Sequence, residues 1–427
     1  MQRIMINNLN NYINEQVLIK GWIASIRRLK SVTFLILRDR SGLIQCVIDN
    51  KILNLSISLE SSVEIVGTIV LNRNDLNPYE INVERFSLIS QATTPLPIEI
   101  NKKDLDVTLD TMLNNRMLSL RHEKINSIFK IQNIISNGFR EFLNNKGFTE
   151  ISTPKIVKEG AEGGSEIFKL KYFENDAYLC QSPQFYKQIM VGAGFERVFE
   201  IGHVYRAEEH NTSRHLNEYI SMDLEIGFID DESELMDLEE ELLKYILDKI
   251  NKEGKRILNN FQVQIPKINN IPRIELDEAI KIVNMEYGKS NPEGDLDPEG
   301  EKLICKYAKE KFNSDFIFLT HYPRSKRPMY TMPNGKFQTN SFDLLFKGIE
   351  ITTGGQRIHD YDMLIDNIKY KGLNPDNYRS YTENFKYGMP PHGGLAIGLE
   401  RITCQVLGLK NIREASLIPR DRTRLIP

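Results

Sequence analysis

Apolar and polar residues alternate along much of residues 1–100, with a period of about two. β-Branched and aromatic residues gather in five short runs separated by turn-forming residues, at 17–26, 33–39, 43–49, 62–71 and 79–89. The pattern predicts five strands and one helical stretch near Ile52–Glu60. Five strands of this length predict a small closed barrel, one face of which stays open to a ligand.

The period changes to that of a helix at residue 124. Ile128, Ile135 and Phe142 fall on one helical face, and Gly147 is a residue type that commonly ends a helix. A strand-like segment, residues 149–157, follows. It contains Pro154, which cannot donate a hydrogen bond within a sheet, so we expect this strand at a sheet edge or an interface.

Strands and helices mix after Tyr178, which indicates an α+β unit built on an antiparallel sheet flanked by helices. Residues 230–241 carry eight acidic residues with leucines at helical spacing, so we expect an amphipathic helix whose acids face solvent. Residues 91–110 contain two prolines and no sustained period, which is typical of a linker. We therefore divide the chain into a barrel at 1–100, a linker or hinge at 101–123 and a larger domain at 124–427.

The composition is that of an ordinary globular protein, with 41% hydrophobic and 26% charged residues. A net charge of −3 excludes a uniformly basic nucleic-acid coat but allows a local basic patch. No run of about 18 uncharged apolar residues occurs, so we expect no membrane span. Four cysteines, Cys46, Cys180, Cys305 and Cys404, match no zinc spacing and are too sparse for a disulfide framework, so we expect packed thiols in a cytoplasmic protein.

The two common glycine-rich phosphate loops, GxxxxGK[ST] and GxGxxG, are absent, so a mononucleotide would have to be held by side chains. Arginine suits that task, because its planar guanidinium binds phosphate oxygens in pairs and stays charged. Three segments combine arginine with carboxylates in an apolar frame: 204–228, 350–360 and 393–402. Any one of them alone is equally consistent with surface ion pairs, which contribute little.

Taken together, these segments resemble motifs of the class II aminoacyl-tRNA synthetases. Motif 1 corresponds to about 124–157, motif 2 to about 199–228 and motif 3 to about 391–406. The match is more specific to the aspartyl-tRNA synthetases of the archaeal and eukaryotic type, whose anticodon-binding OB-fold the N-terminal barrel resembles. The strings that carry it are EGGSEIF (162–168), QSPQFYKQ (181–188), RAEEHNTSRHLNEY (206–219), TTGGQRIHD (352–360), YGMPPHGG (387–394) and IPRDRTRLIP (418–427).

The resemblance implies a two-step reaction in a homodimer. L-Aspartate attacks the α-phosphate of ATP, and the aspartyl group then moves to tRNA(Asp), with tRNA(Asn) left open as a second acceptor. Since the nucleophile is already a carboxylate, catalysis should depend on positioning and on neutralising phosphate charge, with Mg²⁺ as cofactor.

The resemblance also implies roles for named residues, with Arg206 and Arg401 as catalytic residues. Tyr219 would stack on adenine, with Arg401 over its other face, and Glu208 would bind the adenine amino group. The implied ATP-binding set is Arg206, Glu208, Arg214, His215, Leu216, Tyr219, Glu350, Gly398, Glu400 and Arg401. The implied metal ligands are Glu350, Thr353 and Asp343, although Asp343 is equally consistent with a surface acid. Ala396 stands where motif 3 commonly has glycine.

Lys187 and Arg357 would clamp the side-chain carboxylate of aspartate, and Asp223 would receive its ammonium group. The full implied aspartate-binding set is Glu162, Ser165, Gln184, Lys187, Arg206, Asp223, Thr353 and Arg357. The implied anticodon-binding residues are Arg27, Phe34, Gln45 and Glu80, with barrel core as the alternative for Phe34. Arg27, Arg28, Lys30, Arg38 and Arg40 form a basic cluster that is opposed, in the local sequence, by Asp39 alone.

Three other functions compete with this one. An asparaginyl-tRNA synthetase shares the motifs, but Lys187 and the PRDRTRLIP segment argue against it. A tRNA-independent asparagine synthetase resembles the catalytic core without the barrel. A non-catalytic RNA-binding module would have lost Arg206, Glu350 or Arg401, and all three are present.

Overall fold

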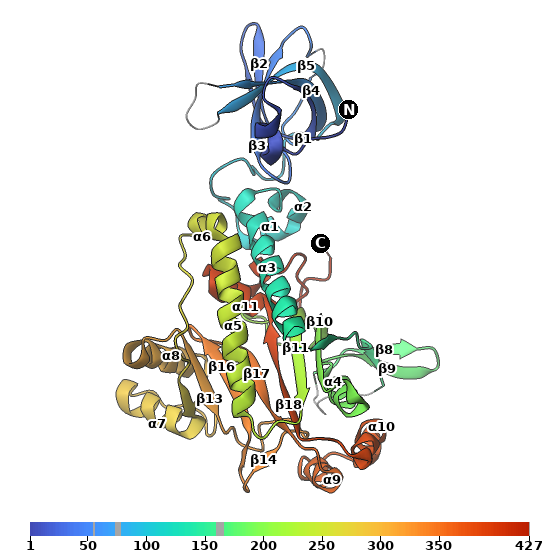
Figure 1. Ribbon diagram of the computed structural model, residues 1–427, viewed down its shortest axis with the longest axis vertical. Coiled ribbons are helices and arrows are strands. Elements are labelled where there is room, and N and C mark those ends of the chain that lie inside the picture. The colour runs from blue at the N-terminus through green and yellow to red at the C-terminus, as the bar shows by residue number, and fades with distance from the viewer. Residues whose placement is uncertain (54–55, 73–77, 159–165, 427) are drawn as a thin grey trace. The chain divides into compact units, whose positions relative to one another are not determined.

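The computed structural model describes residues 1–53, 56–72, 78–158 and 166–426. The chain divides into two compact units, Met1–Thr108 and Leu109–Pro427 (Figure 1). Each unit encloses its own buried apolar clusters, so each is described by itself.

The first unit is a closed five-stranded barrel in the order β1-β2-β3-β5-β4. A short 3₁₀ helix, η1 (Ile6–Tyr12), precedes β1 (Gln16–Arg28), β2 (Val32–Arg38), β3 (Leu43–Asp49), β4 (Ser62–Leu71) and β5 (Tyr79–Ser90). Alternate residues of β2, such as Leu35 and Leu37, are fully buried, whereas Phe34 and Ile36 are half-buried on the outer face. The five strands and the OB-fold barrel are confirmed. The helix expected near Ile52–Glu60 is wrong, because the described part of that stretch forms turns and irregular chain.

The second unit is built on an eight-stranded sheet in the order β12-β13-β16-β17-β18-β11-β10-β6. Its six inner strands pair antiparallel, whereas the edge pairs β12–β13 and β10–β6 are parallel, so the sheet is mixed rather than purely antiparallel. The strands are β6 (Thr149–Glu150), β10 (Arg197–Tyr205), β11 (Glu218–Gly227), β12 (Arg273–Glu275), β13 (Phe316–Thr320), β16 (Ser341–Phe346), β17 (Ile349–Arg357) and β18 (His392–Gly398).

Two long helices run side by side against this sheet, α3 (Glu123–Asn145) and α5 (Ser233–Glu253) (Figure 1). Their apolar faces share one large core with the inner strands and with α11 (Leu399–Leu407). The helix predicted from residue 124 is therefore present. The acidic segment 230–241 enters α5, but its acids are not all solvated, because Glu239 is fully buried.

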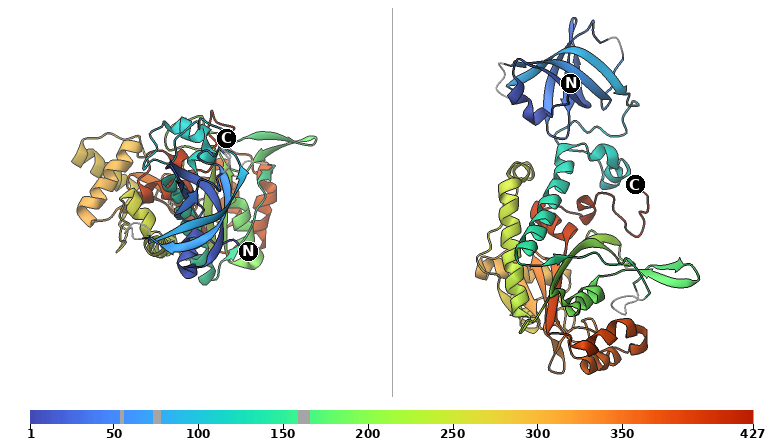
Figure 2. Two further views of the ribbon diagram at one scale, coloured as in Figure 1. Left: turned by 90° about the horizontal axis from the view of Figure 1, so that it is seen from above. Right: turned by 45° about the vertical axis from the view of Figure 1, so that its right-hand side comes forward.

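Shorter elements surround the sheet (Figures 1 and 2). The helices are α1 (Leu109–Asn114), α2 (Arg116–Ser119), α4 (Gln184–Met190), α6 (Lys255–Phe261), α7 (Leu276–Tyr287), α8 (Pro298–Phe312), α9 (Tyr361–Tyr370) and α10 (Arg379–Thr382). Single turns are η2 (Val191–Phe195), η3 (Pro375–Tyr378), η4 (Glu383–Tyr387) and η5 (Ile412–Ala415). A small three-stranded sheet consists of β7 (Ile156–Val157), β9 (Asn175–Leu179) and β8 (Lys169–Tyr172). A two-stranded sheet pairs β14 (Pro333–Asn334) with β15 (Gln338–Thr339).

The strand expected over 149–157 is divided by Pro154. β6 lies at an edge of the large sheet, as the proline predicts, and β7 joins a separate sheet. All four cysteines are buried and free, which confirms packed thiols. No helix in the part of the chain that the structure describes is long and apolar enough to cross a membrane.

Candidate active site

A cavity of about 360 Å³ opens between β11, β17, β18, α11 and the loops around them. Thirteen of the site residues predicted from the sequence line it: Gln184, Arg206, Glu208, Arg214, His215, Leu216, Tyr219, Glu350, Thr353, Arg357, Gly398, Glu400 and Arg401. Among the described residues, Lys187, Asp223 and Asp343 lie behind its wall rather than in it. Glu162 and Ser165 fall outside the described residues.

Two arginines meet acidic and aromatic groups in the cavity. The guanidinium of Arg401, on α11, donates from Nη1 to the carbonyl of Glu350 at 3.1 Å and to its Oε1 at 3.3 Å. The guanidinium carbon of Arg206 lies 6.0 Å from the ring centre of Tyr219. Arg206 is therefore a cation beside this ring, and Arg401 is engaged by the carboxylate of Glu350.

The loop between β10 and β11 carries further polar groups to the same cavity. Arg214 pairs with Glu301 of α8 at 2.5 Å, and His215 Nε2 lies 3.8 Å from Glu208. Burial lowers the pKa of His215 despite the nearby carboxylate of Glu208. Near neutral pH we therefore expect the imidazole of His215 to be neutral.

Glu350 and Thr353 present two oxygen ligands to the cavity, and the Thr353 hydroxyl donates to Glu350 Oε1 at 3.2 Å. Carboxylate and hydroxyl oxygens suit Mg²⁺, which usually takes its remaining ligands from water and substrate phosphates. The described residues hold no cluster of three or more His, Cys, Asp or Glu able to bind a metal by itself. The site therefore fits an ion that arrives with a nucleotide.

Asp343 is buried, so the surface alternative for this residue is wrong. Its Oδ1 lies 2.7 Å from Nη2 of Arg327, whose guanidinium carbon is 3.8 Å from the ring centre of Tyr322. Burial raises the pKa of Asp343 to about 6, although Arg327 opposes that shift. Arg327 lines the cavity and was not predicted from the sequence. Its partner Asp343 lies sixteen residues further along the chain, and no sequence pattern indicates that the two side chains pair.

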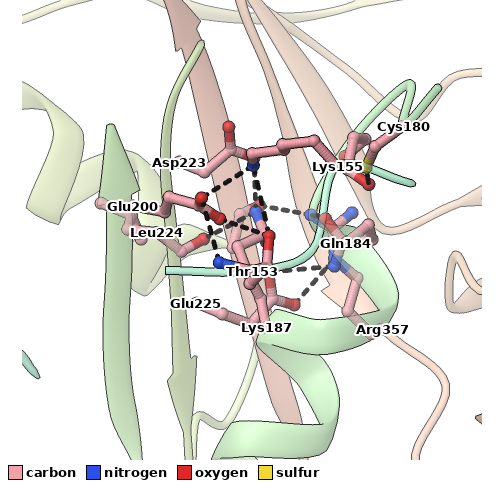
Figure 3. A network of polar contacts seen from close by, with 12 residues as sticks. Thr153, Lys155, Cys180, Gln184, Lys187, Glu200, Asp223, Leu224, Glu225 and Arg357 are labelled. Carbon is pink, nitrogen blue, oxygen red and sulfur yellow. Dashed lines mark hydrogen bonds and ion pairs between the residues drawn. The ribbon is translucent and has the colours of Figure 1, made fainter. Parts of the chain in front are cut away.

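A network of four charged side chains lies at the cavity wall, where Arg357 lines the cavity and Lys187, Asp223 and Glu225 are buried behind it (Figure 3). Lys187 Nζ, on α4, is fully buried and contacts Asp223 Oδ1 at 2.8 Å and Glu225 Oε2 at 3.4 Å. Arg357, at the end of β17, donates from Nε to Glu225 Oε1 at 3.1 Å and from Nη2 to the carbonyl of Gly394 at 2.9 Å. Two cations are thus balanced by two carboxylates.

Glu225 is the central acid of this network, and sequence analysis missed it. Burial alone would raise its pKa, but the charges of Arg357 and Lys187 outweigh burial and lower it. Gln184 Nε2 also donates to Glu225 Oε2, at 3.0 Å. The sequence does contain one indication of Glu225. Residues two apart in a strand point to the same face, so Glu225 is expected on the face of Asp223, which precedes it by two. A Cβ atom at Gly394 would lie 2.1 Å from Glu225 Oε2, so this glycine leaves room for the carboxylate.

A second polar group lies beside the first (Figure 3). Lys155 Nζ contacts Glu200 Oε1 at 2.7 Å, and the Thr153 hydroxyl donates to Glu200 Oε2 at 2.7 Å. Glu200 stands opposite Asp223 in the β10–β11 register. The segment after α3 therefore connects directly to the strand pair that carries the charged network.

Glu400, in α11, lines the cavity and binds the backbone of β11 beside it. Both of its carboxylate oxygens accept from the Ile220 backbone N–H, at 3.2 and 3.1 Å. Burial raises its pKa to about 8. Ala396 lines the cavity, so its methyl group stands at the wall where the motif commonly has glycine.

The barrel brings its four predicted residues to one outer face. Arg27 stands opposite Phe34, and Gln45 stands opposite both Ile36 and Glu80. Gln45 Nε2 donates to Glu80 Oε2 at 2.8 Å. Phe34 is half-buried outside the barrel core, so the core alternative is wrong. The basic cluster is smaller than expected, because Arg38 pairs with the buried carboxylate of Glu60.

Comparisons with known proteins match the barrel and the larger unit to two separate families. Residues 108–422 match the family described as tRNA synthetases class II (D, K and N), and residues 17–89 match the OB-fold nucleic acid binding domain. The chain is 47% identical to the aspartate–tRNA(Asp/Asn) ligase of Deinococcus radiodurans, over 100% of the chain and 99% of that protein. It is 44% identical to the aspartate–tRNA(Asp) ligase of Thermoplasma volcanium, over 100% of both. Asparaginyl-tRNA synthetase from Pyrococcus horikoshii, solved with asparaginyl-adenylate, superposes with a TM-score of 0.91 at 29% identity, over 100% of both chains.

Proposed function

The chain belongs to the class II tRNA synthetases of the D, K and N group, and we propose that it attaches L-aspartate to tRNA through an aspartyl-adenylate. Relatives at 44–47% identity over the whole chain are named aspartate–tRNA ligases. The fold alone does not separate aspartate from asparagine, since an asparaginyl enzyme superposes with a TM-score of 0.91. The choice therefore depends on the charged network at the cavity wall.

The buried cations Arg357 and Lys187 are the observation that carries the proposal. Arg357 lines the cavity, so it is the group that would contact the side-chain carboxylate of aspartate, while the buried Lys187 would add its positive field from behind. An asparagine amide would bring no charge to this position. Because Glu225 already pairs with Arg357, asparagine would not leave this cation unpaired. It would lack the charge-assisted hydrogen bonds of a carboxylate, which contribute about 1.5–3 kcal/mol and correspond to roughly ten- to a hundred-fold discrimination.

The cavity suits adenylate formation without a general base. The α-carboxylate of aspartate is already ionised, so the enzyme has to align it with the α-phosphorus and neutralise charge on the phosphate oxygens. We assign the α-phosphate to Arg206 and the outer phosphates to Arg401 and Arg214, all of which line the cavity. Mg²⁺ would supply further charge neutralisation when bound, and Glu350 and Thr353 are the residues that would hold it.

The outer face of the barrel suits single-stranded RNA. OB-folds commonly bind bases by stacking them on aromatic side chains and by hydrogen bonds to their edges. Phe34 offers the ring, Gln45 and Glu80 offer amide and carboxylate groups beside it, and the exposed Arg27 offers a charge for phosphate. We assign this face to the anticodon.

Three finer assignments complete the proposal. The name of the Deinococcus radiodurans relative supports tRNA(Asn) as a second acceptor besides tRNA(Asp). We assign α3 and the segment that follows it to a homodimer interface, on the resemblance to motif 1, and place the enzyme in the cytoplasm, where tRNA is charged.

Four charging reactions test the proposal: purified tRNA(Asp) and tRNA(Asn), each with labelled aspartate or labelled asparagine. We expect aspartate to be attached to both tRNAs and asparagine to neither. Charging with asparagine would favour the asparaginyl enzyme. Aspartate-dependent exchange of pyrophosphate into ATP, without any charging of tRNA, would favour the tRNA-independent ligase.

A further inference from the structure

Strand β17 contains a bulge at its active-site end. Leu344 and Leu345 are neighbours in β16, but they stand opposite Thr352 and Glu350, so Ile351 is the extra residue of β17 in this register. A bulge of this kind bends a strand and re-aims its side chains. In a regular strand, residues three apart point to opposite faces. Here Glu350 and Thr353 both line the cavity and share a hydrogen bond of 3.2 Å.

Of the two residues between them, Thr352 faces the helix layer instead. The Thr352 hydroxyl donates to Glu239 Oε1 of α5 at 2.6 Å, and both side chains are buried, with 1% and 0% of their surface exposed. Thr352 is therefore connected to α5, whereas Glu350 and Thr353, on either side of it, reach the cavity.

The place of Glu239 is unusual for a carboxyl group. Around it, α5 buries apolar side chains, among them Leu235, Met236, Leu242 and Leu243. Its Oε2 has no hydrogen-bond partner among the described residues. Burying a polar group that is only partly satisfied is unfavourable, and an apolar side chain of similar size would pack there without that cost. Burial raises the pKa of Glu239 to about 8, so near neutral pH the bond to Thr352 joins two uncharged groups.

We infer that Glu239 is a positioning residue for the nucleotide site: through Thr352 it fixes the bulge that sets Glu350 beside Thr353. The inference rests on the proposed function, in which these two residues hold the Mg²⁺ that accompanies ATP. Removing the bond from either end frees β17 to take a regular register, which would separate the two oxygen ligands. Of the residues assigned to aspartate, Thr353 alone belongs to the bulge, whereas Lys187, Asp223 and Arg357 lie on α4, β11 and the far end of β17, so affinity for aspartate should change far less than affinity for Mg²⁺.

Four variants separate this role from simple packing. Glu239→Leu and Thr352→Val remove the bond, whereas Glu239→Gln and Thr352→Ser retain an acceptor and a hydroxyl. Leu243→Ala, one turn further along α5, is the matched control, because it leaves a cavity in the same core without touching the bulge. Unfolding in urea identifies the conditions under which every variant compared is folded.

Two binding titrations provide the readout, one with a non-hydrolysable ATP analogue at varied Mg²⁺ and one with aspartate. We expect Glu239→Leu and Thr352→Val to raise the Mg²⁺ concentration at half-saturation about tenfold, as the loss of an outer-shell contact typically does. Aspartate affinity should stay within about threefold of the wild type, and the Gln and Ser variants should bind Mg²⁺ within about threefold of the wild type. The double variant Glu239→Leu/Thr352→Val should be no weaker than either single one, because one bond is removed.

Wild-type Mg²⁺ dependence in both Glu239→Leu and Thr352→Val would overturn the inference, as would an equal weakening in Leu243→Ala. Should Glu239→Leu not fold, Thr352→Val, which is nearly isosteric, decides alone. Failure of the proposed function is distinguishable, because the wild type itself would then not bind the ATP analogue or would not charge tRNA with aspartate.

Discussion

The buried network to which we assign aspartate contains two acids and two cations. Lys187 and Arg357 would select an acidic substrate, yet Asp223 and Glu225 already neutralise them. Unpaired buried cations would lower the stability of the empty enzyme, because ions lose hydration in the interior. The acids therefore keep the two cations charged and in place until the substrate arrives. Asp223 is already paired with Lys187. The ammonium group of the substrate, which we assign to Asp223, therefore has to compete with Lys187 for this carboxylate.

Lys187→Met tests this arrangement, since it keeps the length of the side chain and removes its charge. We expect kcat/KM for aspartate in pyrophosphate exchange to fall about a hundred-fold or more, because two buried carboxylates lose a counter-ion. KM for ATP should change by less than about threefold. Lys171→Met, which removes an exposed lysine from β8, is the control and should leave both parameters unchanged. Equal losses for aspartate and ATP would contradict the role assigned to Lys187.

His392 gives the protein a pH-dependent stability. Its Nδ1 lies 2.8 Å from the carbonyl of Pro390, and burial lowers its pKa from 6.5 to about 4. Between those values the unfolded chain binds a proton that the folded protein does not, so stability rises with pH across this window. A shift of this size corresponds to about 3 kcal/mol. Urea unfolding at pH 4.5 and pH 7 should show a smaller pH difference for His392→Gln than for the wild type. Equal differences would contradict this account.

Single residues could be predicted from the sequence where a motif fixes their place, and most of those line one cavity. Glu225, Arg327 and Glu239 were missed for a shared physical reason. Each acts through a partner on another element, namely Arg357, Asp343 and Thr352, and strand register decides those partners. A sequence pattern shows which face a residue takes, but not which side chain stands opposite.

At the scale of elements, long periodic segments were predicted best. The helix from residue 124 and the five barrel strands have enough repeats for the period to be clear. The helix expected near Ile52–Glu60 and the strand over 149–157 are shorter, so one proline or one turn decides their conformation. Segment 230–241 shows a further limit, since acidic composition indicated a solvated face and one of its acids, Glu239, is buried.

The outer barrel face should act in tRNA binding but not in adenylate formation. Phe34→Ala removes the ring on which we place an anticodon base, and stacking of one base contributes about 1–3 kcal/mol. We expect KM for tRNA to rise between about fivefold and a hundred-fold, with unchanged pyrophosphate exchange in the absence of tRNA. Phe312→Ala, which removes an exposed ring at the end of α8, is the control. An unchanged KM for tRNA in Phe34→Ala would exclude the assigned face.

At the scale of the whole molecule, the two units separate RNA recognition from chemistry. Each has its own buried core, so residues 109–427 should fold when expressed alone. We expect this fragment to retain aspartate-dependent pyrophosphate exchange near the level of the whole chain and to charge tRNA at least about tenfold less efficiently, because it lacks the face that binds single-stranded bases. A folded fragment that charges tRNA as well as the whole chain would show that the barrel does not contribute.

The small net charge of −3 fits this division, since the cations proposed to contact ATP, RNA and aspartate are few and lie in two local sites. In the proposed function, Arg206, Arg401 and Arg214 would contact phosphate in the cavity, and Arg27 would offer a charge on the barrel. Lys187 and Arg357 are neutralised by Asp223 and Glu225. A polyanionic partner therefore does not require a basic chain.

The central claim is that the buried charges select aspartate. The most direct measurement is the ratio of kcat/KM for aspartate to that for asparagine in pyrophosphate exchange by the wild type, with Arg357→Met measured beside it. We predict a ratio of at least about ten in the wild type, from the charge-assisted hydrogen bonds that Arg357 would make to a carboxylate but not to an amide, and a ratio near one in the variant. A wild-type ratio near one, or a ratio unchanged by Arg357→Met, would contradict the account.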